Sequence, residues 1–504
     1  MNTTKHSFGA GHFFRTVLLG GMALALAGTS AASDKFPRLG IISTGGPQKY
    51  ASSFQAFAAK QNVVIIGGSW EGWQQGAGYS KQTVIASIKS QSYVNTHVFQ
   101  YVLLNSLFNS TYAGSNGFPT WYRQVSARNW WLYPVGASGT PVADPQSSQR
   151  WLVNMGPSVP VDPATGLGPY AWAAKYVDDL FHLGRYAGTS AAPSLDGFFL
   201  DNVLIDPANG GGNVANGDWA RNYTTQAHNA ANTYNTLIAG QKQFYSHLAT
   251  SWPGSQQLGN VGATFALAAS NYYSATDATL NNQVLSATSA LSGAISGGAV
   301  EHAIGKSFSI ETYGGSAALQ QWYRTALNNV GGSKLMLLSH GMVQANGSDP
   351  VTFSAGVPAT WSPAWRGMRY GLCAALMNNG YYTPDSGVYD EETPTNRRWF
   401  DEFDNGGRGE GYLGNPVATV AGNPQTTSWS NGVWKREFQG GVVLWNPRGS
   451  GARTVNVAAL VSPSGHTGLK HILGTQNPGL NNGYAVSTVT LQDRDGLILL
   501  WVTP

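Results

Sequence analysis

The stretch Leu195-Asp196-Gly197-Phe198-Phe199-Leu200-Asp201-Asn202 decides the fold expected for this chain. Its apolar run, Phe198 to Leu200, stops on a carboxylate and an amide. A continuous apolar run is typical of a buried parallel strand, and α/β barrels carry their functional groups at the C-terminal ends of such strands. The stretch therefore predicts a parallel strand with Asp201 at its functional end. The alternative role for Asp201 is to cap the loop that follows.

Further apolar runs alternate with helical patterns along the chain. The predicted strands cover residues 38–44, 62–67, 97–105, 197–201, 257–262, 297–302, 334–340 and 380–383. The predicted helices cover residues 52–60, 83–89, 170–183, 224–250, 317–329 and 366–377. Eight strands interleaved with helices predict a (β/α)8 TIM barrel over residues 34–408. A doubly wound sheet would need fewer strands and a glycine-rich phosphate loop, which Gly45-Gly46 does not provide.

After residue 408 the pattern changes to short apolar runs separated by turn residues. These runs cover residues 434–438, 441–445, 454–457, 485–491 and 497–502. The segments Asn446-Pro447-Arg448-Gly449 and Asn481-Asn482-Gly483 have the composition of turns. We therefore expect a small antiparallel β-sandwich over residues 409–504. Structural support of the barrel is favoured over a dedicated sugar-binding role for it.

The first 33 residues are typical of a secretory signal peptide. The positively charged residues Lys5 and Arg15 come before an apolar segment that extends from Thr16 to Ala27. The small residues Ser30-Ala31-Ala32 follow it. We expect residues 1–33 to be removed and the protein to be secreted or periplasmic; the alternative is an N-terminal anchor that stays attached. No later segment has the roughly 18 uninterrupted apolar residues of a membrane-spanning helix.

Charge and composition restrict the expected partners. Removing Lys5 and Arg15 lowers the formal charge from +4 to about +2, and the chain has no basic run, so neither nucleic acid nor an anionic membrane is expected as main partner. The single cysteine, Cys373, lies in an apolar stretch and predicts a buried thiol. A charged fraction of 11% combined with 17 Trp and 23 Tyr suits a carbohydrate, because aromatic rings stack on sugar faces.

Two carboxylates end predicted strands. Asp201 ends the fourth strand and Glu301 ends the sixth. Strands two apart in a closed barrel share one mouth, where carboxyl separations of about 5 to 10 Å would fit either a retaining or an inverting cleavage of a glycosidic bond. The sequence therefore predicts Asp201 and Glu301 as a catalytic pair. Glu311 is the rival for the second carboxylate, with helix capping as its other explanation.

Several further residues are predicted at the same mouth. His340 ends the seventh strand and is equally well explained as a core histidine; the loop aromatics Trp130, Trp131, Tyr272 and Tyr273 could stack on sugars or belong to the core. The predicted substrate-binding set is Trp70, Asn105, Trp131, Asn202, Asn260, Tyr272, Glu311 and His340. No His-Glu-x-x-His, Gly-x-Ser-x-Gly or Walker-type motif is present, so no metal site, serine nucleophile or cofactor is expected.

Five segments carry a resemblance to a known group. They are Asp-Gly-Phe-Phe-Leu-Asp-Asn (196–202), Gly-Gly-Ala-Val-Glu-His (297–302), the stretch from Met368 to Tyr382, Trp-Phe-Asp-Glu-Phe-Asp (399–404) and the stretch from Arg436 to Pro447. Together these segments resemble bacterial secreted glycoside hydrolases of the TIM-barrel type. More distantly, the chain is similar to barrels of the endo-α-1,4-polygalactosaminidase and α-galactosidase type.

The resemblance implies a role for each carboxylate. Those families use an Asp after the fourth strand and a second carboxylate from a later strand, which makes Asp201 the expected nucleophile and Glu301 the expected acid/base. The long insert between the third and fourth strands departs from the compact polygalactosaminidases. We expect hydrolysis of a poly- or oligosaccharide without a cofactor. The alternatives are a non-catalytic carbohydrate-binding or exopolysaccharide-assembly protein and, less favoured by the residues, a polysaccharide lyase.

Overall fold

The computed structural model describes residues 35–43, 47–67, 80–110, 118–134, 139–144, 147–156, 159–186, 191–201, 230–260, 291, 293–305, 309–341, 343–344, 353–354, 362–385, 399–417, 427–462 and 464–502. These residues belong to one compact unit. The predicted signal peptide lies outside them. Within the described ranges, no helix is both long enough and apolar enough to cross a membrane.

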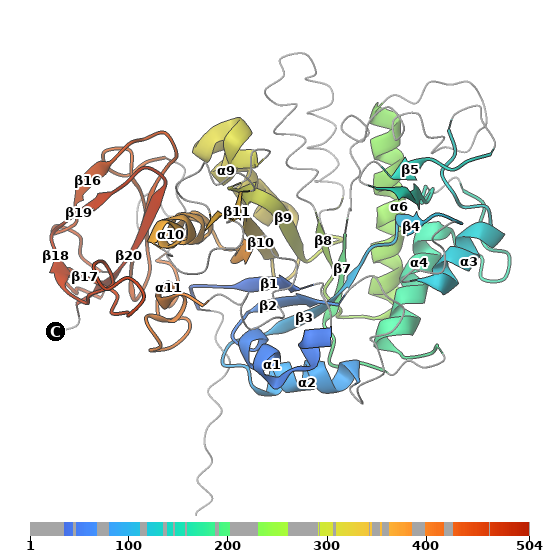
Figure 1. The fold of residues 1–504 in the computed structure, drawn as a ribbon, viewed down its shortest axis with the longest axis horizontal. Coiled ribbons are helices and arrows are strands. Elements are labelled where there is room, and N and C mark those ends of the chain that lie inside the picture. The colour runs from blue at the N-terminus through green and yellow to red at the C-terminus, as the bar shows by residue number, and fades with distance from the viewer. Residues whose placement is uncertain are drawn as a thin grey trace, which may run out of the picture. The chain divides into compact units, whose positions relative to one another are not determined.

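Eight parallel strands form the central sheet (Figure 1), in the order β1-β2-β3-β7-β8-β9-β10-β13. Their bounds are β1 (Gly40–Ser43), β2 (Val63–Ile66), β3 (His97–Val102), β7 (Gly197–Leu200), β8 (Leu258–Asn260), β9 (Gly297–Ile304), β10 (Leu335–Gly341) and β13 (Tyr381–Asp385). All eight predicted strands are therefore confirmed, with ends that differ by at most three residues.

The sheet closes on itself. Leu39, just before β1, pairs in parallel with Tyr382 of β13. The offset in register around the closed sheet can be counted from Phe199. When the pairing is followed through all eight strands, it returns to the β7 segment at position 191, which is eight residues before Phe199. Eight strands with a shear of eight are the geometry of a TIM barrel. The predicted (β/α)8 barrel is confirmed.

Helices connect the strands and cover the outside of the barrel (Figure 1). They are α1 (Ser52–Ala58), α2 (Lys81–Ser90), α4 (Pro169–Val177), α6 (Ala230–Ser251), α9 (Ile310–Asn329) and α10 (Ser362–Leu376). Ser80 caps α2 by accepting a hydrogen bond from the N–H of Thr83 at 3.1 Å. Where one helix over residues 170–183 was predicted, α4 gives way to a π-helical turn, Asp178–His182.

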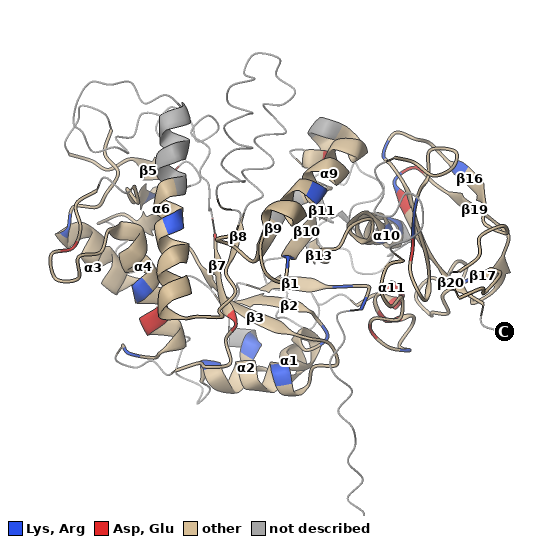
Figure 2. Ribbon diagram, turned by 180° about the vertical axis from the view of Figure 1, so that it is seen from behind, with Lys and Arg blue, Asp and Glu red and all other residues tan. Residues whose placement is uncertain are grey.

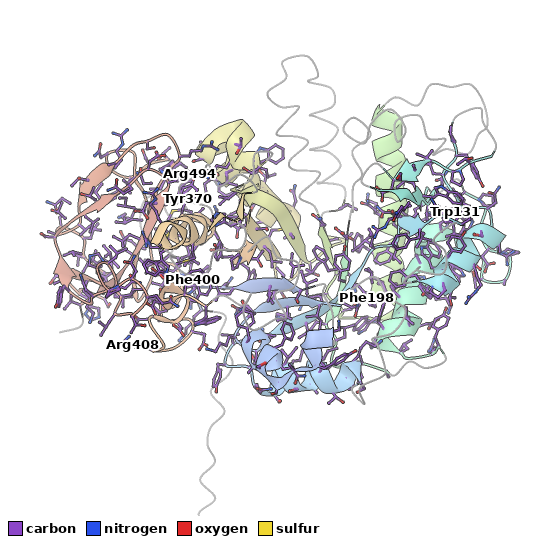
Figure 3. The ribbon with its side chains drawn as sticks, viewed as in Figure 1. Trp131, Phe198, Tyr370, Phe400, Arg408 and Arg494 are labelled. Carbon is purple, nitrogen blue, oxygen red and sulfur yellow. The ribbon has the colours of Figure 1, made fainter. Side chains whose placement is uncertain are left out.

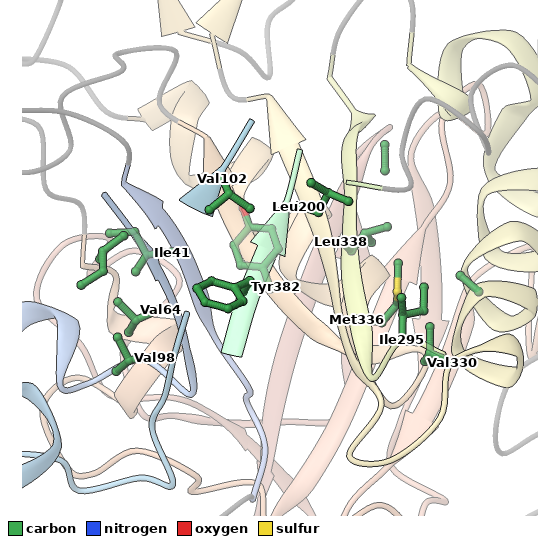
Figure 4. Close-up of a cluster of buried hydrophobic side chains, with 14 of the residues drawn as sticks. Ile41, Val64, Val98, Val102, Leu200, Ile295, Val330, Met336, Leu338 and Tyr382 are labelled. Carbon is green, nitrogen blue, oxygen red and sulfur yellow. The ribbon is translucent and has the colours of Figure 1, made fainter. Parts of the chain in front are cut away.

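Strand side chains alternate between the barrel interior and the helix layer. The interior core contains Val63, Ile65, Phe99, Phe199, Leu258, Ala299, Leu335, Leu337 and Tyr381. The intervening residues face the helices, and Figure 4 shows several of them: Ile41, Val64, Val98, Val102, Leu200, Met336, Leu338 and Tyr382. Because both faces are buried, the strands read as continuous apolar runs.

The chain makes a long excursion between β3 and β7. It contains β4 (Ser106–Phe108), α3 (Pro119–Ala127), β5 (Ala143–Asp144) and β6 (Ser147–Leu152), and its strands form an antiparallel sheet in the order β4-β6-β5. Trp121 of α3 and Trp172 of α4 stack with their ring centroids 5.4 Å apart. The buried aromatic residues of the excursion thus pack against α4, and they belong to the same core as the helix-facing residues of the barrel strands. Neither its helix nor its strands were predicted.

The C-terminal part forms two antiparallel sheets. One has the order β14-β15-β20-β17-β18, and the other consists of β16 and β19. Their bounds are β14 (Trp434–Glu437), β15 (Gly441–Asn446), β16 (Arg453–Asn456), β17 (Leu469–His471), β18 (Ala485–Val486), β19 (Thr488–Leu491) and β20 (Asp495–Trp501). Apolar side chains from both sheets share a core, as in the predicted sandwich. β17 was not expected, and the single run predicted over residues 485–491 is divided into β18 and β19, which belong to different sheets.

The larger C-terminal sheet also contacts the barrel. Its other face packs on α10, where Trp445 of β15 stacks on Tyr370 with ring centroids 5.5 Å apart. Cys373, also on α10, is fully buried, as expected. The short helix α11 (Asp401–Asp404) leads from the barrel into this region. The boundary between residues 408 and 409 stays a prediction.

Candidate functional site

Asp201 lies immediately after β7, at the C-terminal end of the strand. Its backbone N–H donates to the carbonyl of Val102 at 2.8 Å and so extends the β3–β7 pairing by one residue. Phe199, two residues earlier, belongs to the interior core. Strand alternation therefore directs the Asp201 side chain to the inside of the barrel, at the end where TIM barrels bind their substrates.

Both oxygens of the Asp201 carboxylate accept a hydrogen bond from a neutral donor. Asn260, the last residue of β8, donates through Nδ2 to Oδ1 at 2.8 Å. The hydroxyl of Tyr101, on β3, donates to Oδ2. Hydrogen bonds donated to a carboxylate favour its ionised form. The neighbouring strands β3, β7 and β8 thus hold the Asp201 carboxylate at both of its oxygens.

The predicted partner of Asp201 lies on β9. Glu301 follows Ala299, an interior residue, by two positions in that strand. Val300 pairs with Leu338, and Ile304 pairs with His340. Over this stretch β9 therefore has two residues more than β10, which is an irregularity in the strand pairing. The Glu301 side chain is outside the described residues. The pairing of Asp201 with Glu301 therefore remains a prediction, and so does their separation.

Other predicted site residues fall in parts of the chain that follow the C-terminal ends of strands. Trp70 comes after β2, Asn202 after β7, and Tyr272 and Tyr273 after β8. All four lie outside the described residues, and their predicted contacts with substrate are untested.

His340 lies on the outer face of the barrel wall. It is fully buried in β10, and its Nδ1 is 3.1 Å from the hydroxyl of Tyr382, which belongs to the helix-facing core. A Cβ on Gly371 of α10 would come within 2.3 Å of the same nitrogen. His340 thus fills the layer between β10 and α10 and does not face the mouth, in contrast to the expectation from the sequence.

Glu311 occupies the first turn of α9 and contacts the C-terminal sheets. Its Oε1 accepts a hydrogen bond from the Tyr370 hydroxyl at 2.7 Å, and its Oε2 lies 3.2 Å from Nη2 of Arg494. The side chain is fully buried. These contacts explain the carboxylate as part of the packing between α9, α10 and the C-terminal sheets, so Glu311 is left out of the site proposed below.

Trp131 and Asn105 belong to the excursion after β3. The Trp131 ring, labelled in Figure 3, is buried. Its centroid lies 5.4 Å from that of Tyr122 and 5.5 Å from that of Trp151. Asn105 is also buried, and its carbonyl accepts a hydrogen bond from the N–H of Val153 at 2.9 Å. Both residues therefore help to form the excursion itself.

Tyr101 is the site residue that the sequence did not reveal. It precedes Asp201 by 100 positions and carries no motif. The available signal was the register of β3 against β7. Tyr101 pairs with Phe199, and an inward-facing residue that pairs two positions before Asp201 can reach its carboxylate. In the view of Figure 2, the charged residues are few and scattered along the ribbon, so charge alone does not mark the site.

No known family profile matches this chain. No curated protein matches its sequence. Among solved structures, it is similar to Eubacterium rectale Amy13B at 11% identity, covering 94% of this chain and 97% of that one with a TM-score of 0.46. It is similar to the glycoside hydrolase domain of PelA from Pseudomonas aeruginosa at 12% identity, with 69% and 95% covered and a TM-score of 0.34.

A third similar structure is an alpha-amylase from Malbranchea cinnamomea, at 9% identity, with 92% and 96% of the two chains covered and a TM-score of 0.40. The matched structures thus include proteins named as glycoside hydrolases, the class that the sequence motifs resemble. Identities and TM-scores this low do not identify a reaction. The function is argued from the site.

Proposed function

We propose that the protein is a glycoside hydrolase in which Asp201 acts as the ionised carboxylate and Glu301 as the second carboxyl group. The observation that carries this proposal is the Asp201 carboxylate at the barrel mouth, with Asn260 and Tyr101 each donating to one of its oxygens. An ionised carboxylate is what the nucleophile of a retaining enzyme or the base of an inverting enzyme requires.

Glu301 completes the pair in this proposal. Glycosidic cleavage also needs a carboxylic acid that protonates the leaving oxygen. Asp201 is poorly suited to that task, because its two neutral donors stabilise the form that has already lost its proton. We propose Glu301 for this acid because it lies in β9 two residues beyond the interior residue Ala299. We further propose a poly- or oligosaccharide substrate and export directed by residues 1–33.

The test is activity of the mature chain on bacterial exopolysaccharides and aryl glycosides, with product analysis. Asp201→Asn and Glu301→Gln should each lower kcat by about 10³-fold or more, because each removes a group that takes part in bond cleavage. Circular dichroism should show unchanged folds. The Glu301 variant should recover most activity on substrates with good leaving groups, which need little protonation, whereas the Asp201 variant should not.

Two results would contradict the proposal. One is wild-type turnover by both variants on a substrate that the unmodified protein hydrolyses. The other is a wild-type protein that binds a polysaccharide of the panel but cleaves none, which would identify a binding protein on a barrel of this type.

A further inference from the structure

We infer that Tyr101 is a positioning residue that fixes the orientation of the Asp201 carboxylate and stabilises its charge during the reaction. This inference rests on the proposed function and adds to it a residue of β3 that neither the motifs nor the comparisons indicate. It follows from the pairing of β3 with β7, the packing of the Tyr101 ring and the distribution of donors around Asp201.

The strand register brings the hydroxyl to the carboxylate. Tyr101 pairs with Phe199, so Asp201 lies two residues further along β7, about 7 Å toward the mouth. A tyrosine side chain that rises along the barrel wall covers this distance. A Phe ring at the same position would keep the packing but lose the donor that reaches Oδ2.

Packing restricts the direction of the Tyr101 ring. It stacks on Phe199, with ring centroids 6.0 Å apart and planes inclined by 24°. Phe199 itself is 2% exposed in the interior core, so this support is rigid. The hydroxyl is thereby presented to Asp201 by two neighbouring strands, and little side-chain freedom remains to be lost when substrate binds.

The donors act on opposite oxygens of one group. Asn260 donates to Oδ1 from β8, and Tyr101 donates to Oδ2 from β3. A carboxylate bound at one oxygen can still rotate about its Cβ–Cγ bond, whereas one bound at both oxygens cannot. The inference therefore gives Tyr101 two measurable effects, on rate and on pH dependence.

The experiment compares Tyr101→Phe with wild type on the substrate identified above. We expect kcat to fall by about 10- to 100-fold, as for the loss of a hydrogen bond to a charged group, with KM within about twofold. The acid limb of the kcat/KM profile should move to higher pH, because the ionised carboxylate has lost a donor. Replacing Tyr101 by 3,5-difluorotyrosine, a stronger donor, should move that limb to lower pH.

Tyr381→Phe is the matched control. Tyr381 is also an interior tyrosine, but it is the first residue of β13 and thus lies at the other end of its strand. This variant should keep kcat, KM and the acid limb. Thermal unfolding of all variants shows whether a lost rate reflects a lost fold, and crystal structures show whether the Asp201 carboxylate turns away from Asn260 when the Tyr101 hydroxyl is absent.

The outcomes separate this inference from the proposed function. An inactive Asp201→Asn protein combined with a Tyr101→Phe protein of wild-type rate and unchanged acid limb overturns the role of Tyr101 and leaves the hydrolase intact. An acid limb that ignores fluorination of Tyr101 also overturns it. A fully active Asp201→Asn protein instead removes the proposed function, and the inference with it.

Discussion

Lys81 is a charged residue in an environment that disfavours charge. It opens α2 and is only 4% exposed. Its Nζ donates to the carbonyls of Leu180 and Phe181, at 3.1 and 3.2 Å, and lies 4.6 Å from the centroid of the Phe181 ring. Burial lowers the pKa of Lys81 from 10.5 to about 7. The amino group thus joins α2 to the π-helical turn at the cost of desolvation.

This lowered pKa predicts a pH-dependent stability. Between pH 7 and 10.5 the unfolded chain holds a proton on Lys81 that the folded chain has lost, so the free energy of unfolding should rise with pH, by at most about 1.4 kcal/mol per unit. Below pH 7 this contribution is absent, since both states are protonated. Lys81→Met should therefore flatten the rise in urea midpoint between about pH 7 and 9.5 relative to wild type. Parallel midpoint curves for the two proteins would contradict it.

At the scale of single elements, close backbone contacts explain one glycine of the strand that carries Asp201. Gly197 opens β7, and a Cβ at this position would lie 1.6 Å from the carbonyl oxygen of Gln256, before β8. Gly197→Ala must therefore push the two strands apart, and we expect a loss of about 3 kcal/mol in stability. Gly479→Ala, where nothing lies within 4 Å, is the control for thermal unfolding. Equal melting temperatures for the two variants would show that β7 yields more easily than its packing suggests.

The sequence predicted these elements better than it predicted which face of a strand a side chain occupies. Parallel strands buried on both faces produce apolar runs such as Leu335 to Leu338, which mark a strand but do not fix its alternation. For this reason His340 was expected at the mouth, although it packs against α10. Asn260 was predicted at the same mouth as Asp201, where it donates to that carboxylate. Tyr101 was not, because its contact depends on a register between strands 100 residues apart.

At the scale of the whole molecule, buried ion pairs join the barrel helices to the C-terminal sheets. Arg369 of α10 lies 3.1 Å from Asp495 of β20, and Arg494 lies 3.2 Å from Glu311 of α9. All four side chains are nearly inaccessible. The larger sheet is therefore covered on both faces, by its own sandwich partner and by α10. These contacts fit the supporting role that the sequence favoured, and the choice between support and sugar binding stays a prediction.

Glu311→Leu tests this support. It leaves Arg494 buried without its carboxylate partner, and we expect a loss of about 3 to 5 kcal/mol in stability, while kcat and KM of the folded protein stay at the wild-type level. The double variant Glu311→Leu with Arg494→Leu should recover part of the loss, since no unpaired charge remains. A fall in kcat/KM with unchanged melting temperature would instead return Glu311 to the list of substrate-binding residues.

The excursion between β3 and β7 has a consequence for how the activity of such a barrel can diversify. It leaves β3 just after Tyr101 and Val102 and returns just before β7, and its tryptophans are buried in the core that also contains the helix-facing side chains of the barrel strands. Its surface residues can therefore be exchanged without disturbing the strand pairing that holds Tyr101 against Asp201. Under the proposed function, the surface of the excursion is therefore where the sugar preference can change while the carboxylate site stays the same.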